Sequence, residues 1–395
     1  MKIAYFSPAF FSDVDLSYIM QAKKMVDIDY YLPLLGHRKN YCAININGVY
    51  PRFGIYKATE LYPELQPLTN LIDNKHFYVV NSPAKKMWHP QNILLYIKFA
   101  WQLRKYDVIH ITMFPYYYEW PLYFLRKKIV LTVHDPFPHS DAKDNVPLVM
   151  RARARAWRML NHFIILNDAQ MADCIRLNHL EKKHIYSSRL SRYDYLHMYQ
   201  HANASIANCQ SEAVNHKTFL YFGLINHYKG IDILLEAMLK VHEKFPNCRL
   251  VIAGRGEWPF DIAPYEYLDY IEFNHRFIPD YELVALINNC TCVVCPYRDA
   301  TQSGVVMSAF AFNKPVIATN VGGLPEQVID GKYGRIVPPC DVDALADAMC
   351  DMVENPQVIS AYAKNIEADY ALGAKSWNTI TKSMIKIYQQ VVKNI

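Results

Sequence analysis

One lysine stands where an expected strand, a loop and an expected helix meet. The apolar run Phe219–Phe222 ends at Gly223, and a polar loop then leads to Lys229 and Gly230. From Ile231 onward, apolar residues recur at helical spacing and predict an amphipathic helix. Free backbone N–H groups and the positive end of the helix dipole meet at such a helix start, where anions bind. Two interpretations stay open at this stage: a phosphate or diphosphate site, or an ordinary strand–helix turn with a surface lysine.

Three further loops that follow expected strands also contain glycine. They span residues 254–257, 296–304 and 320–326. In a parallel sheet such loops emerge on the same side, and glycine lets a backbone approach a ligand closely. Ser303-Gly304 also precedes an expected helix, and it offers a hydroxyl and backbone N–H groups to a phosphate. Four glycine loops on one face, one of them with a lysine, favour a phosphorylated ligand.

The chain around these loops alternates short apolar strands with helices. In the first half the expected strands are Ile3–Phe6, Phe77–Val80, Val108–Thr112, Ile129–Val133 and Phe163–Leu166. The region 32–66 is rich in Pro, Tyr and Gly, so we expect irregular structure there. After residue 217 the alternation of strands and helices resumes. This pattern predicts an α/β fold with two doubly wound parallel-sheet, Rossmann-like domains that face a cleft.

Composition along the chain indicates where the domains divide. Residues 198–217 hold few large apolar side chains and are rich in Asn, Ser, Gln and His, which is typical of a linker. We therefore expect one domain over residues 1–200, a second over 201–375 and a final helix over 376–395. Five apolar side chains share one face of that helix: Trp377, Ile380, Met384, Ile387 and Val391. An apolar face must be covered, so we expect the helix to pack on the first domain.

Composition also excludes several classes of protein. The chain has 395 residues, of which 52% are hydrophobic and 20% charged, so it can bury substantial cores. The net charge, 42 − 37 = +5, comes without any nucleic-acid-binding motif, so we expect no nucleic-acid partner. No apolar stretch of about 18 residues predicts a transmembrane helix. The start MKIAYFSPAFF predicts a strand rather than a secretory signal, and with nine cysteines this indicates a cytoplasmic protein.

Two cysteines have the spacing of a metal or redox pair. Cys292 and Cys295 form a C-x-x-C motif, but they lie within the expected strand TCVVC. Residues three apart on a strand point to opposite faces of the sheet, so the two thiols do not share a metal or a redox role. We expect both side chains in the buried core instead.

The order of motifs in the second half resembles the retaining glycosyltransferases of family 4. The motifs are the lysine–glycine loop, LVIAGRGE, RFIPDYEL, a proline-ended strand with TQSG, KPVIAT with VGGLPE, and DGKYGRIVPP. The resemblance spans residues 218–390, and MKIAYFSP, DVIHI and LTVHDPFPH in the first half fit more loosely. It implies the two-domain GT-B fold. It also implies transfer of a sugar from a nucleotide-diphosphate sugar with retained anomeric configuration, without a bound metal or a cofactor.

The resemblance assigns roles to particular residues. Lys229, together with backbone near Ser303 and Gly304, is implied to hold the donor diphosphate. This role makes physical sense, because the leaving nucleoside diphosphate gathers negative charge that fixed charges and N–H dipoles must stabilise. His134 is implied to contact the donor sugar, with Asp135 orienting its loop; a strand-end histidine capped by the next residue is the competing interpretation. The other donor-binding candidates are Gly223, Gly230, Gly254, Arg255, Phe277, Ile278, Arg298, Asp299, Thr301, Ser308 and Glu326.

The sequence departs from the family in three places. Where the family has an arginine near the lysine loop, this chain has Leu224 and Asn226, and Arg298 or Arg255 is the candidate replacement. The paired glutamates are absent, and a TQSG segment, found in a subset of the family, stands in their place. The loop 7–16 after the first strand, SPAFFSDVDL, contains no glycine.

Features of the first half bear on the acceptor. Arg151, Arg155 and Arg158 share a face of an expected helix, which either contacts an anionic membrane or is simply solvated. The aromatic cluster Tyr116–Tyr118 with Trp120 lines an acceptor cleft or packs in the core. The resemblance implies a saccharide or lipid-linked acceptor, surface polysaccharide or glycolipid synthesis, and a peripheral place at the inner face of the membrane.

Two other classes of function compete with a glycosyltransferase. A binding or regulatory protein with the same fold and nucleotide site, but without transfer activity, is compatible with the missing glutamates. A nicotinamide-dependent oxidoreductase would carry G-x-G-x-x-G after the first strand. The segment SPAFFSDVDL has no glycine, which counts against the oxidoreductase.

Overall fold

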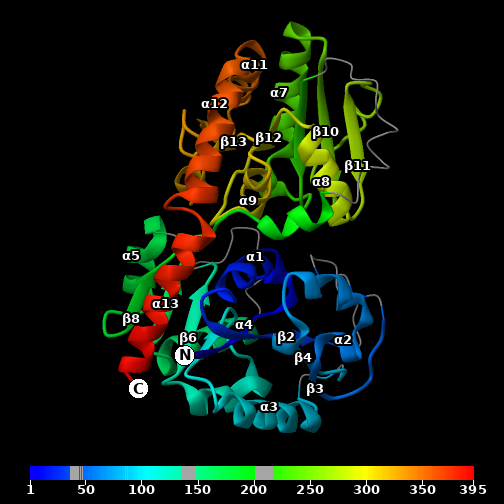
Figure 1. Ribbon diagram of the computed structural model, residues 1–395. Coiled ribbons are helices and arrows are strands. Elements are labelled where there is room, and N and C mark those ends of the chain that lie inside the picture. Colours follow the sequence, from blue (N-terminus) through cyan, green and yellow to red (C-terminus); the bar gives the residue numbers. More distant parts are fainter. Residues whose placement is uncertain are drawn as a thin grey trace. The chain divides into compact units, whose positions relative to one another are not determined.

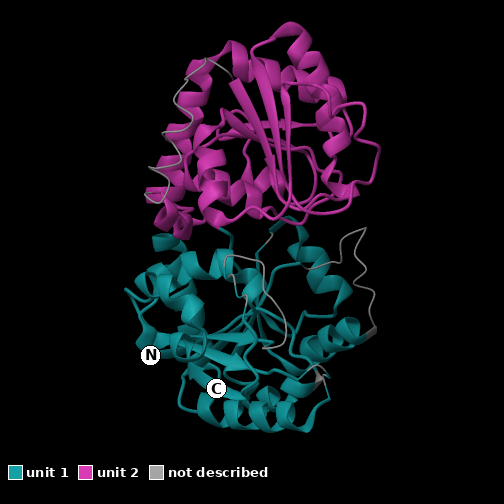
Figure 2. Cartoon of the chain, turned by 90° about the vertical axis from the view of Figure 1, so that its right-hand side faces the viewer, with its two compact units in different colours: residues 1–138, 142–190, 377–395 teal, residues 139–141, 191–376 magenta. Residues whose placement is uncertain are grey.

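The computed structural model divides the chain into two compact units, which Figure 2 shows in different colours. Unit 1 comprises residues 1–138, 142–190 and 377–395, and unit 2 comprises residues 139–141 and 191–376. The structure describes residues 1–35, 44, 46, 48–84, 86, 88–135, 147–166, 168–200 and 217–395. Most of the expected linker therefore lies outside the described residues.

Unit 1 is built on an eight-stranded sheet (Figure 1). Its strands are β1 (Lys2–Phe6), β2 (Asp27–Leu34), β3 (Gly54–Lys57), β4 (Phe77–Asn81), β5 (Val108–Ile111), β6 (Ile129–Val133), β7 (His162–Ile165) and β8 (His184–Ser187). The strand order is β3-β4-β2-β1-β5-β6-β7-β8, and every pair is parallel except β3 with β4. The chain starts in the middle at β1, adds β2 beside it, then forms β3 at the edge and β4 between β2 and β3, and continues from β5 on the other side.

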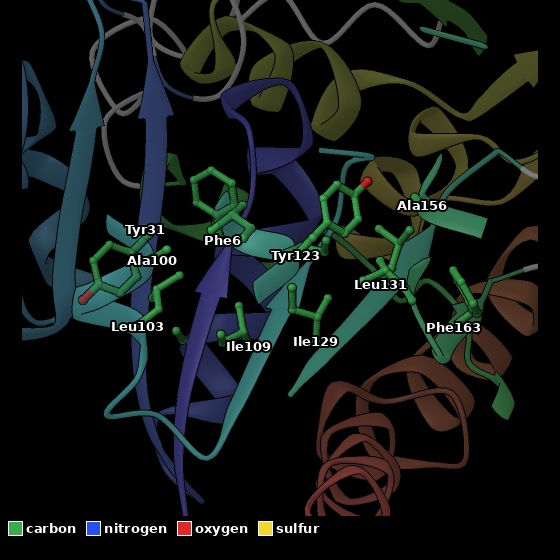
Figure 3. Close-up of a cluster of buried hydrophobic side chains, with 14 of the residues drawn as sticks. Phe6, Tyr31, Ala100, Leu103, Ile109, Tyr123, Ile129, Leu131, Ala156 and Phe163 are labelled. Carbon is green, nitrogen blue, oxygen red and sulfur yellow. The ribbon is translucent and has the colours of Figure 1, made fainter. Parts of the chain in front are cut away.

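Helices cover both faces of this sheet. They are α1 (Ser12–Ala22), α2 (Ala58–Leu61), α3 (Pro90–Leu103), α4 (Pro147–Met159) and α5 (Asp168–Leu177), with the 3-10 segments η1 (Ala9–Phe11), η2 (Pro63–Asn70), η3 (Asn74–His76) and η4 (Tyr117–Leu125). Helix α3 begins with proline, whose missing N–H costs nothing in a first turn. Its buried residues Leu95, Phe99 and Leu103 recur every four positions and enter the core cluster drawn in Figure 3.

The last helix, α13 (Trp377–Lys393), belongs to unit 1 and packs against α1. The five apolar side chains that share its predicted face are all buried. Its Tyr388 hydroxyl lies 2.8 Å from the Tyr18 hydroxyl and 2.7 Å from His110 Nδ1. The chain thus leaves unit 1 after residue 190 and completes it again from residue 377.

Unit 2 is built on a six-stranded parallel sheet. Its strands are β9 (Lys217–Phe222), β10 (Cys248–Gly254), β11 (Ile271–His275), β12 (Cys292–Cys295), β13 (Val316–Thr319) and β14 (Gly334–Val337), in the order β11-β10-β9-β12-β13-β14. Its helices are α7 (Ile231–Lys244), α8 (Asp280–Asn289), α9 (Gly304–Ala311), α10 (Leu324–Gln327), α11 (Val342–Glu354) and α12 (Pro356–Ile366), with the short segments η5 (Asp194–Tyr199), η6 (His227–Lys229) and η7 (Glu367–Leu372). No helix in the described part of the chain combines the length and the apolar character needed to cross a membrane.

The predicted fold class is confirmed, but the set of five strands in the first half was incomplete. Strands β2, β3 and β8 were missed, and the region 32–66, expected to be irregular, includes β3 and the end of β2. Strand β2 reads DIDYYLPL, in which acids and a proline hide the strand pattern. Its Asp29 is nevertheless buried, because it bonds to His76 Nδ1 at 2.7 Å and to the Tyr106 hydroxyl. Hydrogen-bond partners from distant parts of the chain therefore make this buried acid tolerable in a strand. The periodicity of the sequence contains no sign of such partners.

Candidate functional site

The sheet of unit 2 has a point where its winding direction reverses. From β9 the strand order grows through β10 to β11 on one side, and from β12 through β13 to β14 on the other. In open α/β sheets, ligands bind beyond the carboxyl ends of the strands at such a point. The lysine loop, residues 223–230, follows β9, and the TQSG loop, residues 296–303, follows β12. The topology thus brings two of the four glycine loops together.

Backbone contacts hold these two loops against each other. The Arg298 N–H donates to the Tyr228 carbonyl oxygen at 2.7 Å. Gly230 has a φ of +64° and caps α7, and a Cβ atom at this residue would lie 2.0 Å from the Pro296 carbonyl oxygen. Only glycine combines a left-handed backbone with so close an approach. The close approach of the two loops therefore requires glycine at position 230.

Lys229 lies between these loops with its ammonium on aromatic rings. The Nζ atom is 3.6 Å from the centroid of the Tyr297 ring and 4.8 Å from that of Tyr228. Within the described residues, no hydrogen bond or ion pair engages this ammonium. Burial lowers the pKa of Lys229 to about 8, so the side chain is still mostly charged at neutral pH. A poorly solvated cation without a counter-charge is well suited to an anionic ligand.

Arg298, a predicted donor-binding residue, forms an ion pair with Asp232 at the start of α7. Its guanidinium donates to both carboxylate oxygens of Asp232, at 2.8 and 2.6 Å, and to the His227 carbonyl oxygen at 2.9 Å. Asp232 lies in the first turn of α7, where a carboxylate is favourable. The structure therefore gives Arg298 a contact that positions the lysine loop. Asp232 was missed by the sequence reasoning, because 66 residues separate it from Arg298.

The TQSG loop precedes α9, and some of its polar groups are already hydrogen-bonded within unit 2. The Ser303 N–H donates to Gln327 Oε1 at 2.9 Å, and the Ser303 Oγ lies 3.3 Å from the Tyr297 hydroxyl. Ser308 donates to the Gly304 carbonyl at 3.0 Å, so its hydroxyl serves the helix itself. Gly304 packs closely on the Tyr193 ring, because a Cβ atom there would lie 2.8 Å from the Tyr193 hydroxyl.

Gln302 was not among the predicted site residues, although it lies inside this loop. Its Nε2 atom is buried and has no hydrogen-bond partner among the described residues. A buried amide donor without a partner costs free energy unless a ligand or water satisfies it. The only sign of this in the sequence was the position of Gln302 between Thr301 and Ser303. We therefore add Gln302 to the candidate site.

The remaining predicted residues of unit 2 lie at the ends of the neighbouring strands. Gly223 and Gly254 approach each other, since a Cβ atom at Gly254 would lie 1.8 Å from the Gly223 carbonyl oxygen. The exposed Arg255 guanidinium lies 5.6 Å from the centroid of the Phe277 ring, beside the edge strand β11. The other side chains range from buried to exposed: Thr301 is buried, Ile278 and Asp299 are half-buried, and Glu326 is exposed.

His134 and Asp135 lie in unit 1, directly after β6, whereas the other predicted residues lie in unit 2. The His134 ring stacks on Phe11, with centroids 3.7 Å apart and planes at 13°. Its Nε2 atom is buried and has no hydrogen-bond partner in the described part of the chain. Burial lowers the pKa of His134 to about 4, against a smaller opposing effect of Asp135, so the ring is neutral near pH 7. Asp135 itself is exposed.

Unit 1 also has a cavity of about 440 Å³ where its own sheet reverses direction, between β1 and β5. Residues that follow four strands line it, together with a group of tyrosines: Pro8, Ala9, Phe10, Pro33, Leu34, Leu35, Ile46, Tyr62, Ser82, Tyr96, Met113, Tyr116, Tyr118 and Glu119. Glu119 is buried and accepts the Tyr116 N–H at 2.7 Å. Burial raises the pKa of Glu119 to about 7. Of the predicted aromatic cluster, Tyr116 and Tyr118 line this cavity, whereas Trp120 does not.

Two groups with metal-binding residue types do not form part of these sites. Cys292 and Cys295 are fully buried in β12, and burial raises the pKa of both thiols. Asp27, Asp29 and His76 lie close enough together to share an ion. However, the Lys2 ammonium lies 3.6 Å from Asp29 Oδ2 and supplies a positive charge there. Asp27 begins β2, so this group is at the end of the strand opposite to the ligand-binding end.

Comparison with known proteins finds a family match and several relatives for unit 2. Residues 216–355 match the family described as "Glycosyl transferases group 1". The glycogen synthase of Mycobacterium tuberculosis is 27% identical over 177 residues, which are 43% of this chain and 41% of that protein. A phosphatidyl-myo-inositol mannosyltransferase of Mycolicibacterium smegmatis is 24% identical over 183 residues, 44% of this chain and 45% of that protein. The chain thus matches these relatives over less than half of their length.

A solved structure extends the likeness to the whole chain at the level of the fold. Anabaena Alr3699/HepE in complex with UDP has a TM-score of 0.67 and 17% identity, and the match covers 99% of this chain and 100% of that one. The predicted GT-B fold is therefore confirmed. The resemblance to glycosyltransferases read from the motifs is confirmed by the family match, which begins just before β9 and covers the lysine and TQSG loops.

Proposed function

We propose that the chain is a retaining glycosyltransferase that transfers a sugar from a nucleotide-diphosphate sugar to a saccharide or lipid-linked acceptor. We propose that this enzyme acts in the synthesis of a surface polysaccharide or glycolipid. The observation that carries this proposal is the half-buried Lys229 ammonium between two glycine loops at the reversal point of the sheet, where no acid of the described residues pairs with it. The mannosyltransferase relative and the UDP complex of the Anabaena protein support a nucleotide-sugar donor.

In this proposal the donor diphosphate lies between the two loops of unit 2. Charge builds up on the leaving diphosphate as the glycosidic bond breaks, and Lys229 neutralises part of it. The first N–H groups of α9, beginning at Gly304, have no partners within the helix and add oriented dipoles. Gln302 supplies a further N–H donor through its Nε2 atom, which has no partner among the described residues. Together these groups supply, in this proposal, the stabilisation that a metal ion would otherwise provide.

The role proposed for His134 is contact with the donor sugar. Because burial keeps the imidazole neutral near pH 7, one ring nitrogen can donate to a sugar hydroxyl and the other can accept. The stacking on Phe11 fixes the plane of the ring. Asp135, exposed beside it, orients the loop.

For the acceptor we propose the tyrosine-lined cavity of unit 1. Its volume of about 440 Å³ suits one or two sugar rings. Tyrosine rings offer apolar faces to the C–H groups of a sugar, and their hydroxyls bond its polar edge. Glu119 adds a carboxyl group that is partly protonated near neutral pH and can both donate and accept hydrogen bonds. A peripheral location at the inner face of a membrane is also part of the proposal.

The decisive experiment measures turnover with a panel of nucleotide sugars. The purified chain should release nucleoside diphosphate from at least one donor, and the sugar product should keep the anomeric configuration of that donor by NMR. Lys229→Ala should abolish this release. Lys240→Ala, which changes a lysine of the following helix α7, should not. Tight nucleotide binding without turnover of any donor would instead support the inactive binding protein.

A further inference from the structure

Three segments of unit 1 concentrate the positive charge of the chain. Residues 88–106, 116–128 and 147–160 contain ten basic residues: Lys98, Arg104, Lys105, Arg126, Lys127, Lys128, Arg151, Arg153, Arg155 and Arg158. Their single acid is Glu119, which is buried. The segments therefore carry a net +9 in a chain whose total is +5, so that the remainder is net −4. Such segregation creates a local field that attracts an anionic partner.

The same segments expose large apolar side chains. Trp88, Trp101 and Trp120 are 61%, 71% and 39% exposed, whereas the other three tryptophans of the chain are buried or half-buried. Three further residues are also exposed in the first two segments: Leu94, Ile97 and Phe124. On α3 the exposed residues Leu94, Ile97 and Trp101 follow one another at helical spacing, on the side opposite to its core face. Exposed apolar groups at this density mark an interaction surface.

Aromatic and basic side chains meet in a hollow of about 440 Å³ between these segments. Its lining consists of Trp88, Trp120, Tyr123, Phe124, Arg126, Arg155 and Met159. Trp120 and Phe124 pack edge to face, with ring centroids 5.3 Å apart. The Tyr123 side chain is 6% exposed, and its hydroxyl has no hydrogen-bond partner among the described residues. The hollow thus brings two guanidinium groups together within an aromatic rim.

We propose that this aromatic–basic surface docks on an anionic lipid membrane. Tryptophan prefers the headgroup level of a bilayer, where its ring is apolar and its N–H stays hydrated. Arginine and lysine beside it bind the phosphates of anionic lipids, and the hollow is large enough for one headgroup. The charge segregation favours this occupant over an uncharged apolar partner. Trp157, which the sequence placed beside the arginines of α4, is buried and takes no part.

This inference deepens the membrane-associated location in the proposed function, and its test uses no donor sugar. The full chain is mixed with sedimentable vesicles of phosphatidylcholine, with and without phosphatidylglycerol. Binding should require phosphatidylglycerol and weaken as salt is added, because exposed charges are screened. Tryptophan fluorescence should shift to shorter wavelength on binding. Failure of this test would leave the transferase proposal intact, and absence of turnover would leave this one intact.

Two double variants separate the apolar and the charged contributions. Trp120→Ser with Phe124→Ser should weaken vesicle binding by at least about tenfold, since each ring loses its burial in the interface. Arg126→Glu with Lys127→Glu should weaken it by about fivefold for each charge removed, and more for reversal. Thermal unfolding followed by circular dichroism checks that both variants remain folded.

The matched control changes exposed apolar residues of unit 2. Tyr267 and Leu372 are 78% and 81% exposed, and Tyr267→Ser with Leu372→Ser should leave vesicle binding unchanged. Absence of binding to any vesicle, or equal binding by the Trp120/Phe124 variant, would overturn the proposal. Light scattering that shows a dimer dispersed by the same two substitutions would assign the surface to a second copy of the chain instead.

Discussion

A lysine ammonium usually lies in water or beside a carboxylate, and that of Lys229 does neither. On the same stretch of chain, Lys240 pairs with Asp343, and Lys244 pairs with Glu354 at 2.6 Å. Lys229 instead rests on the Tyr297 ring, where burial holds its pKa down to about 8. The three lysines thus differ in the surroundings of their ammonium groups: Lys240 and Lys244 have a carboxylate partner, and Lys229 has an aromatic ring. It makes the charge of Lys229 available to a ligand and sensitive to pH.

Removal of this charge should weaken binding of nucleoside diphosphates. We expect Lys229→Ala to lower the affinity by about 1.5–3 kcal/mol, because a charged hydrogen bond to the diphosphate is lost. The wild-type affinity should fall by up to about tenfold per pH unit above pH 8, as the free ammonium loses its proton. The variant should show no such fall. Isothermal titration calorimetry with uridine and guanosine diphosphates between pH 6.5 and 9.5 measures both effects.

Lys240→Ala is the control for this titration, because it removes an exposed lysine from α7, the helix that follows the lysine loop. Its affinity and pH profile should match those of the wild type. Equal diphosphate affinity of Lys229→Ala and Lys240→Ala would contradict the role given to Lys229.

The titration of Glu119 should make the free energy of unfolding depend on pH. Its folded pKa of about 7 lies above the ordinary value of 4.5, because burial disfavours the charged form. Such a group contributes stability below pH 4.5 and loses that contribution as the pH rises through 7. Glu119→Gln removes the titration and keeps an acceptor for the Tyr116 N–H. The wild type should therefore lose about 3 kcal/mol relative to the variant between pH 4.5 and pH 7.5.

Urea unfolding at several pH values measures this difference in the free energy of unfolding. A constant difference between the two proteins across the range would show that Glu119 has an ordinary pKa. The same variant also tests the acceptor cavity, because it changes a lining side chain without changing its size.

At the scale of elements, the candidate site depends on how loops are joined to helices. The loop after β9 and the loop after β12 touch through Gly230, and the Arg298–Asp232 pair ties the second loop to the first turn of α7. Each of these contacts links residues far apart in the chain. A change in either loop should therefore be felt at Lys229, which lies between them.

Two glycines with the same backbone conformation test whether the packing of the two loops affects Lys229. Gly230 and Gly331 have φ values of +64° and +69°, so alanine should cost about 1–2 kcal/mol of strain at either position. A Cβ atom at Gly331 meets nothing within 4 Å, whereas one at Gly230 meets the Pro296 carbonyl. Gly230→Ala should therefore cost about 3 kcal/mol or more and displace the lysine loop. Diphosphate affinity should fall in Gly230→Ala only.

Chemical denaturation gives the two stabilities, and calorimetry gives the two affinities. If both alanine variants lost the same stability and bound diphosphate equally, the close packing of Gly230 on the second loop would have no consequence for the site.

At the scale of the whole molecule, unit 1 is discontinuous in sequence. Helix α13 completes it after the chain has built all of unit 2. The helix buries apolar side chains along its whole length, and Tyr388 bonds to residues of α1 and β5. Unit 1 therefore cannot reach its native packing until α13 is present.

Truncation tests this dependence. A chain that ends at Ser376 loses the burial of the α13 side chains, which is worth on the order of 10 kcal/mol at about 1.5–3 kcal/mol for each large apolar group. We expect unit 1 of this chain to be unfolded or aggregated, as size-exclusion chromatography and circular dichroism would show. A control chain that ends at Val392 loses only exposed residues and should behave as the wild type. A soluble, cooperatively folded Ser376 chain would contradict the expectation.

The amino-acid sequence by itself determined the parts of this protein that depend on local patterns. Apolar runs and helical spacing predicted the α/β class, the four strands of unit 2 that precede the glycine loops and the buried face of α13. Motif order predicted the glycosyltransferase resemblance. These features are local because burial on one face of a helix or strand leaves a period in the sequence itself. Strand β2 was not predicted, because its Asp29 is hydrogen-bonded by residues elsewhere in unit 1 that the local pattern does not contain.

Only the tertiary structure decided which groups of the candidate site are available. It pairs Arg298 with Asp232 and the Ser303 N–H with Gln327. Among the described residues, it leaves the Lys229 ammonium and the Gln302 Nε2 atom without a hydrogen-bond acceptor. It also gathers three tryptophans and ten basic residues on unit 1, from segments that the sequence separates. Hydrogen bonds and desolvation depend on distances in space, and pairs 24 to 66 residues apart leave no periodic trace in the chain.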